Sequence, residues 1–169
     1  VFGGFASDEL SDRIVDAKPK LIVTASVGRE PRKNIPYYPI ILEGLDKAKE
    51  KLGGELLIKP SILLLQRSDI YIEKDISIEY QTIDYNESVS NIKLSPEDYE
   101  CEYFNSNHPL YILYTSGTTG VPKGIVRDTG GHFVMLDYIM EKVMNINRND
   151  VFLSTSDIGW VVGHNYIIY

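Results

Sequence analysis

Residues 114–124 read Tyr-Thr-Ser-Gly-Thr-Thr-Gly-Val-Pro-Lys-Gly and follow directly after an apolar, strand-like run at residues 110–113. These eleven residues include three glycines, four Ser or Thr hydroxyls and one lysine, Lys123. Glycines let successive backbone N–H groups turn inward and form a concave site for phosphate oxygens. The hydroxyls add donors, and Lys123 adds a mobile positive charge. The stretch therefore predicts a loop that binds a polyphosphate, most simply ATP, at the end of a buried strand.

The order and spacing of these residues can be tested against two other interpretations, a P-loop and a flexible linker. The P-loop of nucleotide hydrolases needs a Gly, four residues and then Gly-Lys-Ser/Thr. Here the second Gly comes after two residues and Pro-Lys-Gly follows, which excludes a P-loop. A flexible surface linker is the ordinary interpretation of a segment rich in Gly and Ser. An ordered pattern placed directly after a strand favours the phosphate loop over the linker.

The loop resembles the phosphate loop of the adenylate-forming enzymes, the acyl-CoA synthetases and their relatives. A second block, Ser156–Tyr166, is similar to the acyl-site segment of the short-chain members. Acetyl-type enzymes read Gly-Trp-Val-Thr-Gly-His-Ser-Tyr there, and propionyl-type enzymes read Gly-Trp-Val-Val-Gly-His-Ser-Tyr. Val162 stands at the Thr position, which makes this wall apolar, whereas Asn165 replaces the usual Ser. Burying one more substrate methylene gains about 1 kcal/mol, so selectivity of roughly 10- to 200-fold is expected.

The resemblance implies two half-reactions with the cofactors ATP, Mg²⁺ and coenzyme A. A short-chain carboxylate, with propionate favoured over acetate, attacks ATP to give acyl-adenylate, and the CoA thiol then takes the acyl group. The β- and γ-phosphates would be held by Thr115, Ser116, Gly117, Thr118, Thr119, Gly120 and Lys123. The acyl pocket would be lined by Trp160, Val161, Val162 and Gly163. The resemblance places His164 beside the acyl carboxylate, and Lys123 and His164 are the candidate catalytic residues.

The resemblance also implies a coenzyme A site in the first part of the chain. Phe2, Gly3 and Gly4 resemble a turn beside the CoA adenine, and Arg29 and Arg32 resemble a pair near the 3′-phosphate. Two guanidinium forks spaced in this way can clamp a phosphate. From composition alone, the segment around these arginines also fits a solvated turn, and both interpretations stay open.

The 169 residues are 43% hydrophobic, which is enough for a packed core. Enzymes of the resembled family are several times longer, so we expect a fragment of their large N-terminal domain without the C-terminal domain that carries a catalytic lysine. Such a fragment is expected to be inactive alone, and a non-catalytic nucleotide- or CoA-binding module is the alternative. The expected parts are a CoA-side α/β portion at 1–68, an acidic insertion or linker at 69–107, and the phosphate-loop and acyl-pocket portion at 108–169.

The net charge of −7 is concentrated in residues 69–102, which hold ten acidic and two basic residues. We interpret this segment as a solvated surface insertion, with a partner-docking site as the alternative. No basic stripe with interleaved aromatic residues indicates nucleic-acid binding, and no apolar run is long enough to span a membrane. The single cysteine, Cys101, cannot form an internal disulfide and fits the cytoplasm or the mitochondrial matrix. The sequence leaves the oligomeric state open.

The hydrophobic spacing predicts an α/β fold of mostly parallel sheet segments flanked by helices. A first helix is expected to begin at a capping Ser7, bury Leu10, Ile14 and Ala17, and stop before Pro19. A second helix at 39–52 is expected to bury Ile41, Leu45 and Ala48. Strands are expected at 1–2, 20–25, 62–65, 79–83, 110–115 and 151–154. A third helix at 131–144 is expected to bury Phe133, Leu136, Met140 and Val143.

Overall fold

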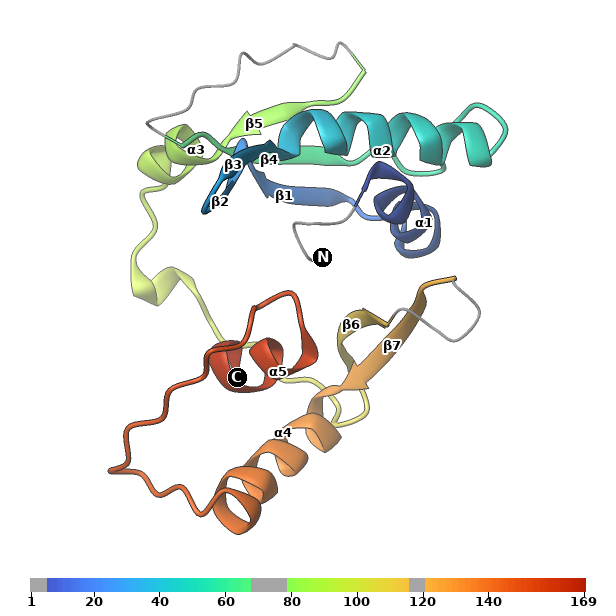
Figure 1. The fold of residues 1–169 in the computed structure, drawn as a ribbon. Helices are drawn as coiled ribbons and strands as arrows, with labels where there is room; N and C mark the ends of the chain where they lie inside the picture. Colours follow the sequence, from blue (N-terminus) through green and yellow to red (C-terminus); the bar gives the residue numbers. More distant parts are fainter. Residues whose placement is uncertain (1–5, 68–78, 116–120) are drawn as a thin grey trace. The chain divides into compact units, whose positions relative to one another are not determined.

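A computed structural model describes residues 6–67, 79–115 and 121–169 (Figure 1). The chain divides into two compact units, with the boundary between residues 98 and 99. We call residues 3–98 the N-terminal unit and residues 99–169 the C-terminal unit. The expected strand at residues 1–2 lies outside the described residues. In the described residues, no helix is both long enough and apolar enough to cross a bilayer.

The N-terminal unit is built on a three-stranded parallel sheet in the order β1-β4-β5. Its strands are β1 (Leu21–Ala25), β4 (Ser61–Leu65) and β5 (Thr82–Asp84). Strands β2 (Val27–Glu30) and β3 (Lys33–Pro36) form a separate antiparallel hairpin. The helical elements are α1 (Ser7–Ala17), α2 (Tyr37–Lys51), α3 (Tyr85–Asn91) and the 3-10 turn η1 (Pro96–Asp98). The parallel sheet with flanking helices confirms the expected fold class.

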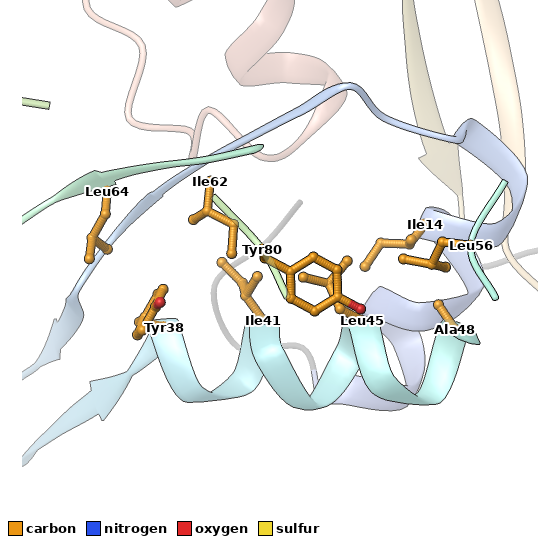
Figure 2. Close-up of a cluster of buried hydrophobic side chains, with 9 residues drawn as sticks. All are labelled: Ile14, Tyr38, Ile41, Leu45, Ala48, Leu56, Ile62, Leu64 and Tyr80. Carbon is orange, nitrogen blue, oxygen red and sulfur yellow. The ribbon is translucent and has the colours of Figure 1, made fainter. Parts of the chain in front are cut away.

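Helix α2 supplies much of the hydrophobic core of this unit (Figure 2). Its apolar residues recur at helical spacing, so Ile41, Leu45 and Ala48 lie on one buried face, as the sequence predicted. This face packs against alternate side chains of β4, Ile62 and Leu64, which point to one side of the strand. The cluster is completed by Ile14, Tyr38, Leu56 and Tyr80. The helix ends at Lys51 and is followed by Gly53 and Gly54, whose φ angles of 82° and 113° few other residues adopt.

Helix α1 differs from the expectation at both of its ends. Ala6, not Ser7, is the N-cap residue, and the Ser7 hydroxyl instead accepts a hydrogen bond from Lys47 Nζ at 2.9 Å. Ala17 is exposed, whereas Ser11 is buried, because α1 packs on α2 partly through polar contacts. Ser11 donates to the Asp8 carbonyl at 2.7 Å and accepts from Lys51 Nζ at 2.7 Å. The stop before Pro19 is confirmed.

Part of the acidic segment belongs to the sheet and is not a surface insertion. Strand β5 pairs with β4, and Tyr80 just before it is only 4% exposed in the core. The neighbouring acidic side chain of Glu79 points to solvent and pairs with Lys49 Nζ at 2.6 Å. Tyr80 therefore lies in the core, whereas the charge of the residue beside it lies at the surface. Residues 68–78 lie outside the described part of the chain.

The C-terminal unit begins with an antiparallel pair, β6 (Pro109–Thr115) and β7 (Lys123–Asp128). Helix α4 (Thr129–Tyr138) follows at once and continues as a π-helical turn, η2 (Ile139–Val143). Its N-cap is Asp128, whose Oδ2 accepts a hydrogen bond from the Gly131 N–H at 2.9 Å. The chain ends in α5 (Val161–Gly163) and a second π-helical turn, η3 (His164–Ile168).

Two expectations about this unit are wrong. Residues 151–154 form no strand, because a strand needs a partner and none of the described strands pairs with them. Helix α4 buries His132 and Leu136, whereas Phe133 and Val143 are exposed. The π-helical turn that begins at Ile139 changes the face on which Val143 lies, whereas Phe133 precedes this turn and is exposed on α4 itself. Strand β7 was not predicted.

Candidate functional site

The predicted phosphate loop connects the two strands of the β6–β7 hairpin. The last residue of β6, Thr115, pairs directly with the first residue of β7, Lys123. The hydroxyl of Thr115 and the ammonium of Lys123 thus come from the two ends of one loop. Ser116, Gly117, Thr118, Thr119 and Gly120 lie outside the described residues.

Gly124 shapes the base of this loop. It pairs with Tyr114 across the hairpin, and a Cβ at this position would lie 3.0 Å from Ile112 Cγ2 and 3.3 Å from Tyr114 Cε1. Because side chains on paired residues meet across two strands, a glycine leaves room for the tyrosine ring. Gly124 in the Lys-Gly pattern at 123–124 therefore serves packing across the hairpin.

The predicted acyl segment is held by hydrogen bonds to Asp157. Its Oδ1 accepts from the Gly159 N–H at 2.6 Å, which is the geometry of an Asx turn, and its carbonyl accepts from the Trp160 N–H at 3.0 Å. The Trp160 carbonyl in turn accepts from the His164 N–H at 3.0 Å. A Cβ on Gly163 would lie 2.1 Å from the Asp157 carbonyl oxygen, so only glycine fits. These contacts fold Trp160–His164 into a tight turn.

Within the C-terminal unit, most side chains of this turn lie at the surface. Trp160 is 53% exposed and Val162 is 46% exposed, and Val161 is similarly open to solvent. His164, in contrast, turns inward and is only partly exposed. The described residues therefore bring the four predicted acyl-pocket residues together on one turn, next to the predicted catalytic histidine.

His164 belongs to a cluster of aromatic rings that the sequence analysis did not identify. Its ring stacks on Tyr111 of β6 with centroids 5.0 Å apart. His132 of α4 meets Tyr111 edge-on at 5.2 Å. Tyr169 stacks on Tyr111 with centroids 5.7 Å apart and meets His132 edge-on at 5.0 Å. Three separate elements therefore contribute to one group of rings. We call Tyr111, His132 and His164 the buried ring cluster.

The buried ring cluster contains polar atoms without hydrogen-bond partners among the described residues. His132 is 2% exposed, and neither of its ring nitrogens is paired. The Tyr111 hydroxyl and His164 Nδ1 are also buried and unpaired. Native proteins pair most such atoms, because an unpaired buried donor or acceptor costs about 1–3 kcal/mol.

One cation lies next to this cluster. Arg127 of β7 stands opposite Tyr111 in the strand register, near its hydroxyl but without a well-formed hydrogen bond. Burial raises the pKa of Tyr111, and the charge of Arg127 partly opposes this. Burial also lowers the pKa of His132, and the Arg127 charge lowers it further, whereas Asp128 raises it. His132 is therefore neutral at pH 7, with one donor and one acceptor nitrogen.

The two predicted CoA-binding arginines lie on the β2–β3 hairpin of the N-terminal unit. Arg29 is on β2, and Arg32 is in the two-residue turn that joins the strands, so both side chains are exposed. Gly28 before them is buried under Tyr37, whose ring would lie 2.1 Å from a Cβ at this position. The segment is a structured hairpin that carries one cation on strand β2 and one in its turn. Phe2, Gly3 and Gly4 lie outside the described residues.

The residues missed from the sequence are Tyr111, His132 and Asp157. The spacing Asp157-x-Gly159 is a recognisable Asx-turn pattern and could have been found. The role of His132 depends on contacts between elements and has no local signal. In the described residues, no group of three or more His, Cys, Asp or Glu side chains is arranged to hold a metal ion.

A parallel sheet covered by helices, together with a hairpin that carries a loop rich in glycine and hydroxyls, defines a protein of the α/β class. The chain belongs to the family of AMP-binding enzymes, whose sequence model matches residues 1–169. This confirms the resemblance to adenylate-forming enzymes.

Its relatives are short-chain acyl-CoA synthetases. The chain is 43% identical over 169 residues to "acyl-CoA synthetase short-chain family member 3, mitochondrial" of Rattus norvegicus, covering 100% of this chain and 23% of that protein. It is 38% identical to the propionate–CoA ligase of Escherichia coli K12, covering 100% of this chain and 25% of that protein. It is 35% identical to the acetyl-coenzyme A synthetase of Xanthomonas oryzae pv. oryzae, covering 100% of this chain and 24% of that protein.

A solved structure supports the fold. The acetoacetyl-CoA synthetase from Streptomyces lividans matches 95% of this chain and 22% of its own, with a TM-score of 0.69 and 21% identity. The chain thus spans about a quarter of the length of its relatives, such as the 23% of the rat protein.

Proposed function

We propose that this chain is part of an AMP-forming short-chain acyl-CoA synthetase. In the first half-reaction, a carboxylate oxygen attacks the α-phosphorus of ATP, and the bond to pyrophosphate breaks. In the second, the thiol of coenzyme A attacks the acyl carbonyl and AMP leaves. The observation that carries the proposal is the pairing of Thr115 with Lys123, which closes a loop of the phosphate-binding pattern. Relatives named as propionate and acetyl-CoA enzymes support it.

Lys123 and the loop residues would position the β- and γ-phosphates of ATP. Lys123 is exposed at the start of a strand, so its ammonium can reach a phosphate in the loop. Such positioning, with compensation of charge, is the main contribution a protein makes to chemistry at a phosphate. Mg²⁺ is usually held by substrate phosphates with few protein ligands, and it would arrive here with ATP.

The acyl group of the substrate would rest against the turn Trp160–Gly163. Val162 gives this turn a methyl group where a threonine would present a hydroxyl. We infer that propionate is preferred over acetate, since an apolar wall favours an extra methylene. The adenylate would then pass its acyl group to coenzyme A, whose phosphate would bind Arg29 and Arg32 on the β2–β3 hairpin.

The mitochondrial relatives and the single cysteine support a place in the mitochondrial matrix, with the cytoplasm as the alternative. Because the chain spans about a quarter of its relatives, we infer that residues 1–169 alone do not complete catalysis. A module that only binds nucleotide or coenzyme A is the outcome to be excluded.

The test is carboxylate-dependent exchange of pyrophosphate into ATP, measured on the full-length protein that contains this chain. Faster exchange with propionate than with acetate is expected, and Val162→Thr should move the preference toward acetate by about tenfold. Lys123→Ala should slow exchange roughly 100-fold or more, while acyl-adenylate supplied directly is still converted to acyl-CoA. Lys142→Ala, an exposed lysine in the same unit, is the matched control.

Absence of exchange with every acid would disprove the synthetase and leave the binding module. A preference for acetate in the wild-type protein would keep the enzyme and reject propionate. If Lys123→Ala slows both half-reactions equally, Lys123 does not act on the departing pyrophosphate.

A further inference from the structure

The buried ring cluster is unusual because its polar atoms serve no visible structural purpose. Tyr111, His132 and His164 come from β6, α4 and η3, and their rings pack within 5.0–5.2 Å. Phenylalanine rings would fill the same space without the cost of unpaired nitrogens and a hydroxyl. Among the described residues both nitrogens of the deeply buried His132 are unpaired, so they are available for hydrogen bonds to a ligand.

The glycines before His132 show how the site is built. A Cβ on Gly130 would lie 2.6 Å from Ser106 Cβ, and one on Gly131 would lie 2.7 Å from Asp128 Oδ2. Both glycines therefore let the first turn of α4 pack closely against its neighbours. The result is that His132 enters the interior directly behind Tyr111. The sequence Asp-Thr-Gly-Gly-His thus places an imidazole at a defined depth.

The charges around the cluster favour a singly charged anion as the ligand. The Tyr111 hydroxyl and one nitrogen of a neutral His132 are donors, and Arg127 stands beside them as a single cation. A carboxylate has two oxygens that accept hydrogen bonds, and a guanidinium compensates its charge. A polyphosphate carries more charge than one arginine compensates.

Resting on the function proposed above, we propose that Tyr111 and His132, with Arg127 at their edge, bind the carboxylate group of the acid substrate. His164 links this subsite to the acyl turn, because it stacks on Tyr111 and its backbone N–H bonds to Trp160. A carboxylate held at Tyr111 and His132 would leave its short alkyl chain to the turn that carries Val162. Tyr111 and His132 are thus substrate-binding residues in addition to those of the phosphate loop and the acyl turn.

The test compares three variants of the full-length protein, each of which keeps an aromatic ring. Tyr111→Phe removes one hydroxyl, and His132→Phe removes two nitrogens. Tyr169→Phe is the matched control, because Tyr169 stacks on the same rings but is partly exposed and its hydroxyl is not among the buried unpaired atoms. The probe is [1-¹³C]propionate without ATP, observed by broadening of its carboxylate signal. Steady-state exchange then gives KM values for propionate and for ATP.

The wild-type protein and Tyr169→Phe should broaden the signal, and Tyr111→Phe and His132→Phe should abolish it. The KM for propionate should rise about tenfold or more in these two variants, whereas the KM for ATP should not change. If His132→Phe fails to fold, Tyr111→Phe decides the question, because it removes a single atom. Wild-type binding of propionate without any exchange would reject the synthetase and retain the subsite. No binding by the wild-type protein, or equal losses in all three variants, would overturn the subsite.

Discussion

The two units of this chain are held together in different ways. The N-terminal unit has a hydrophobic core of nine buried side chains contributed by α1, α2, β4 and the residues around them. Among the described residues of the C-terminal unit, Leu136 is the only large hydrophobic side chain that is as deeply buried. Its structure depends instead on glycines, on helix capping by Asp128, on the Asx turn at Asp157, and on the buried ring cluster. The difference shows that residues assigned here to ligand binding also determine the local fold of the C-terminal unit.

The difference between the two units is tested most directly by replacing one buried leucine in each unit with alanine. Leu45→Ala should destabilise the N-terminal unit by about 2–5 kcal/mol, since Leu45 is completely buried in a packed core. Leu136→Ala should cost less, near the lower end of this range, because few buried neighbours surround it. Hydrogen exchange of the full-length protein, resolved by region, measures both. An equal or larger cost for Leu136→Ala would contradict the difference between the units.

The N-terminal unit was the easier one to predict from sequence. Helix α2 and strands β1 and β4 follow from hydrophobic periodicity, because each has one face on a shared core. Strand β7 was missed, since it exists by pairing with β6 and all of its residues are exposed. Residues 151–154 were wrongly assigned as a strand, because they are an apolar run but no described strand pairs with them. The burial of Tyr80 was not predicted, because acidic residues surround it in the sequence. The Glu79 side chain points to solvent, whereas the Tyr80 ring points into the core.

Candidate site residues could be proposed from the sequence only where a motif is continuous along the chain. The phosphate loop and the acyl turn are continuous segments, so the order of their residues carries the information. Tyr111 and His132 lie far apart in sequence, and no spacing relates them. Their burial depends on the approach of α4 to β6, which the sequence alone does not reveal. The roles of all the candidate site residues stay predictions, and Phe2, Gly3, Gly4 and residues 116–120 also lie outside the described residues.

Replacing one closely packed glycine in each unit gives a second test of the difference between the two units. A Cβ on Gly163 would meet the Asp157 backbone, whereas a Cβ on Gly28 would meet the ring of Tyr37, in each case at 2.1 Å. A ring can rotate away, but the backbone of the acyl turn cannot, so Gly163→Ala should be the more damaging change, by about 1–3 kcal/mol. It should also impair carboxylate-dependent exchange, whereas Gly28→Ala should leave the KM for the carboxylate intact. Thermal unfolding and exchange kinetics measure these effects, and the reverse order would refute this assignment.

The pH dependence of stability should distinguish the C-terminal unit through His132. Burial, then the charge of Arg127, lowers the pKa of His132 below its ordinary value of 6.5, while Asp128 opposes the shift and His164 adds to it. The unfolded chain therefore binds a proton more readily, so His132 makes stability fall as the pH drops below 6.5. His132→Phe should remove this dependence from the exchange-derived stability of α4 and leave that of α2 unchanged. A persistent slope in the variant would assign the effect to another group.

The smallest expected effect concerns the ion pairs of the N-terminal unit. Lys47 Nζ lies 2.8 Å from Asp8 Oδ2 and 3.0 Å from Glu43 Oε1, and its hydrogen bonds lower the pKa of both carboxyl groups. The pair with Asp8 joins α1 to α2 and the pair with Glu43 lies within α2, and both are partly exposed, so salt screens them. Lys47→Met, which keeps an apolar stem, should lower the thermal midpoint slightly at pH 7 and low salt.

The loss should disappear at about 1 M salt, where the screening length is short. It should also disappear as the pH falls below the ordinary carboxyl values of 3.8 and 4.5, because a lowered pKa stabilises the fold only while the group is ionised. Lys142→Met is the control, since its pair with the adjacent Glu141 lies within one turn of the C-terminal unit. It should have no measurable effect, because that contact joins no two elements. A loss from Lys47→Met that persists in high salt would mean that its stem packs against apolar atoms and that the charges contribute little.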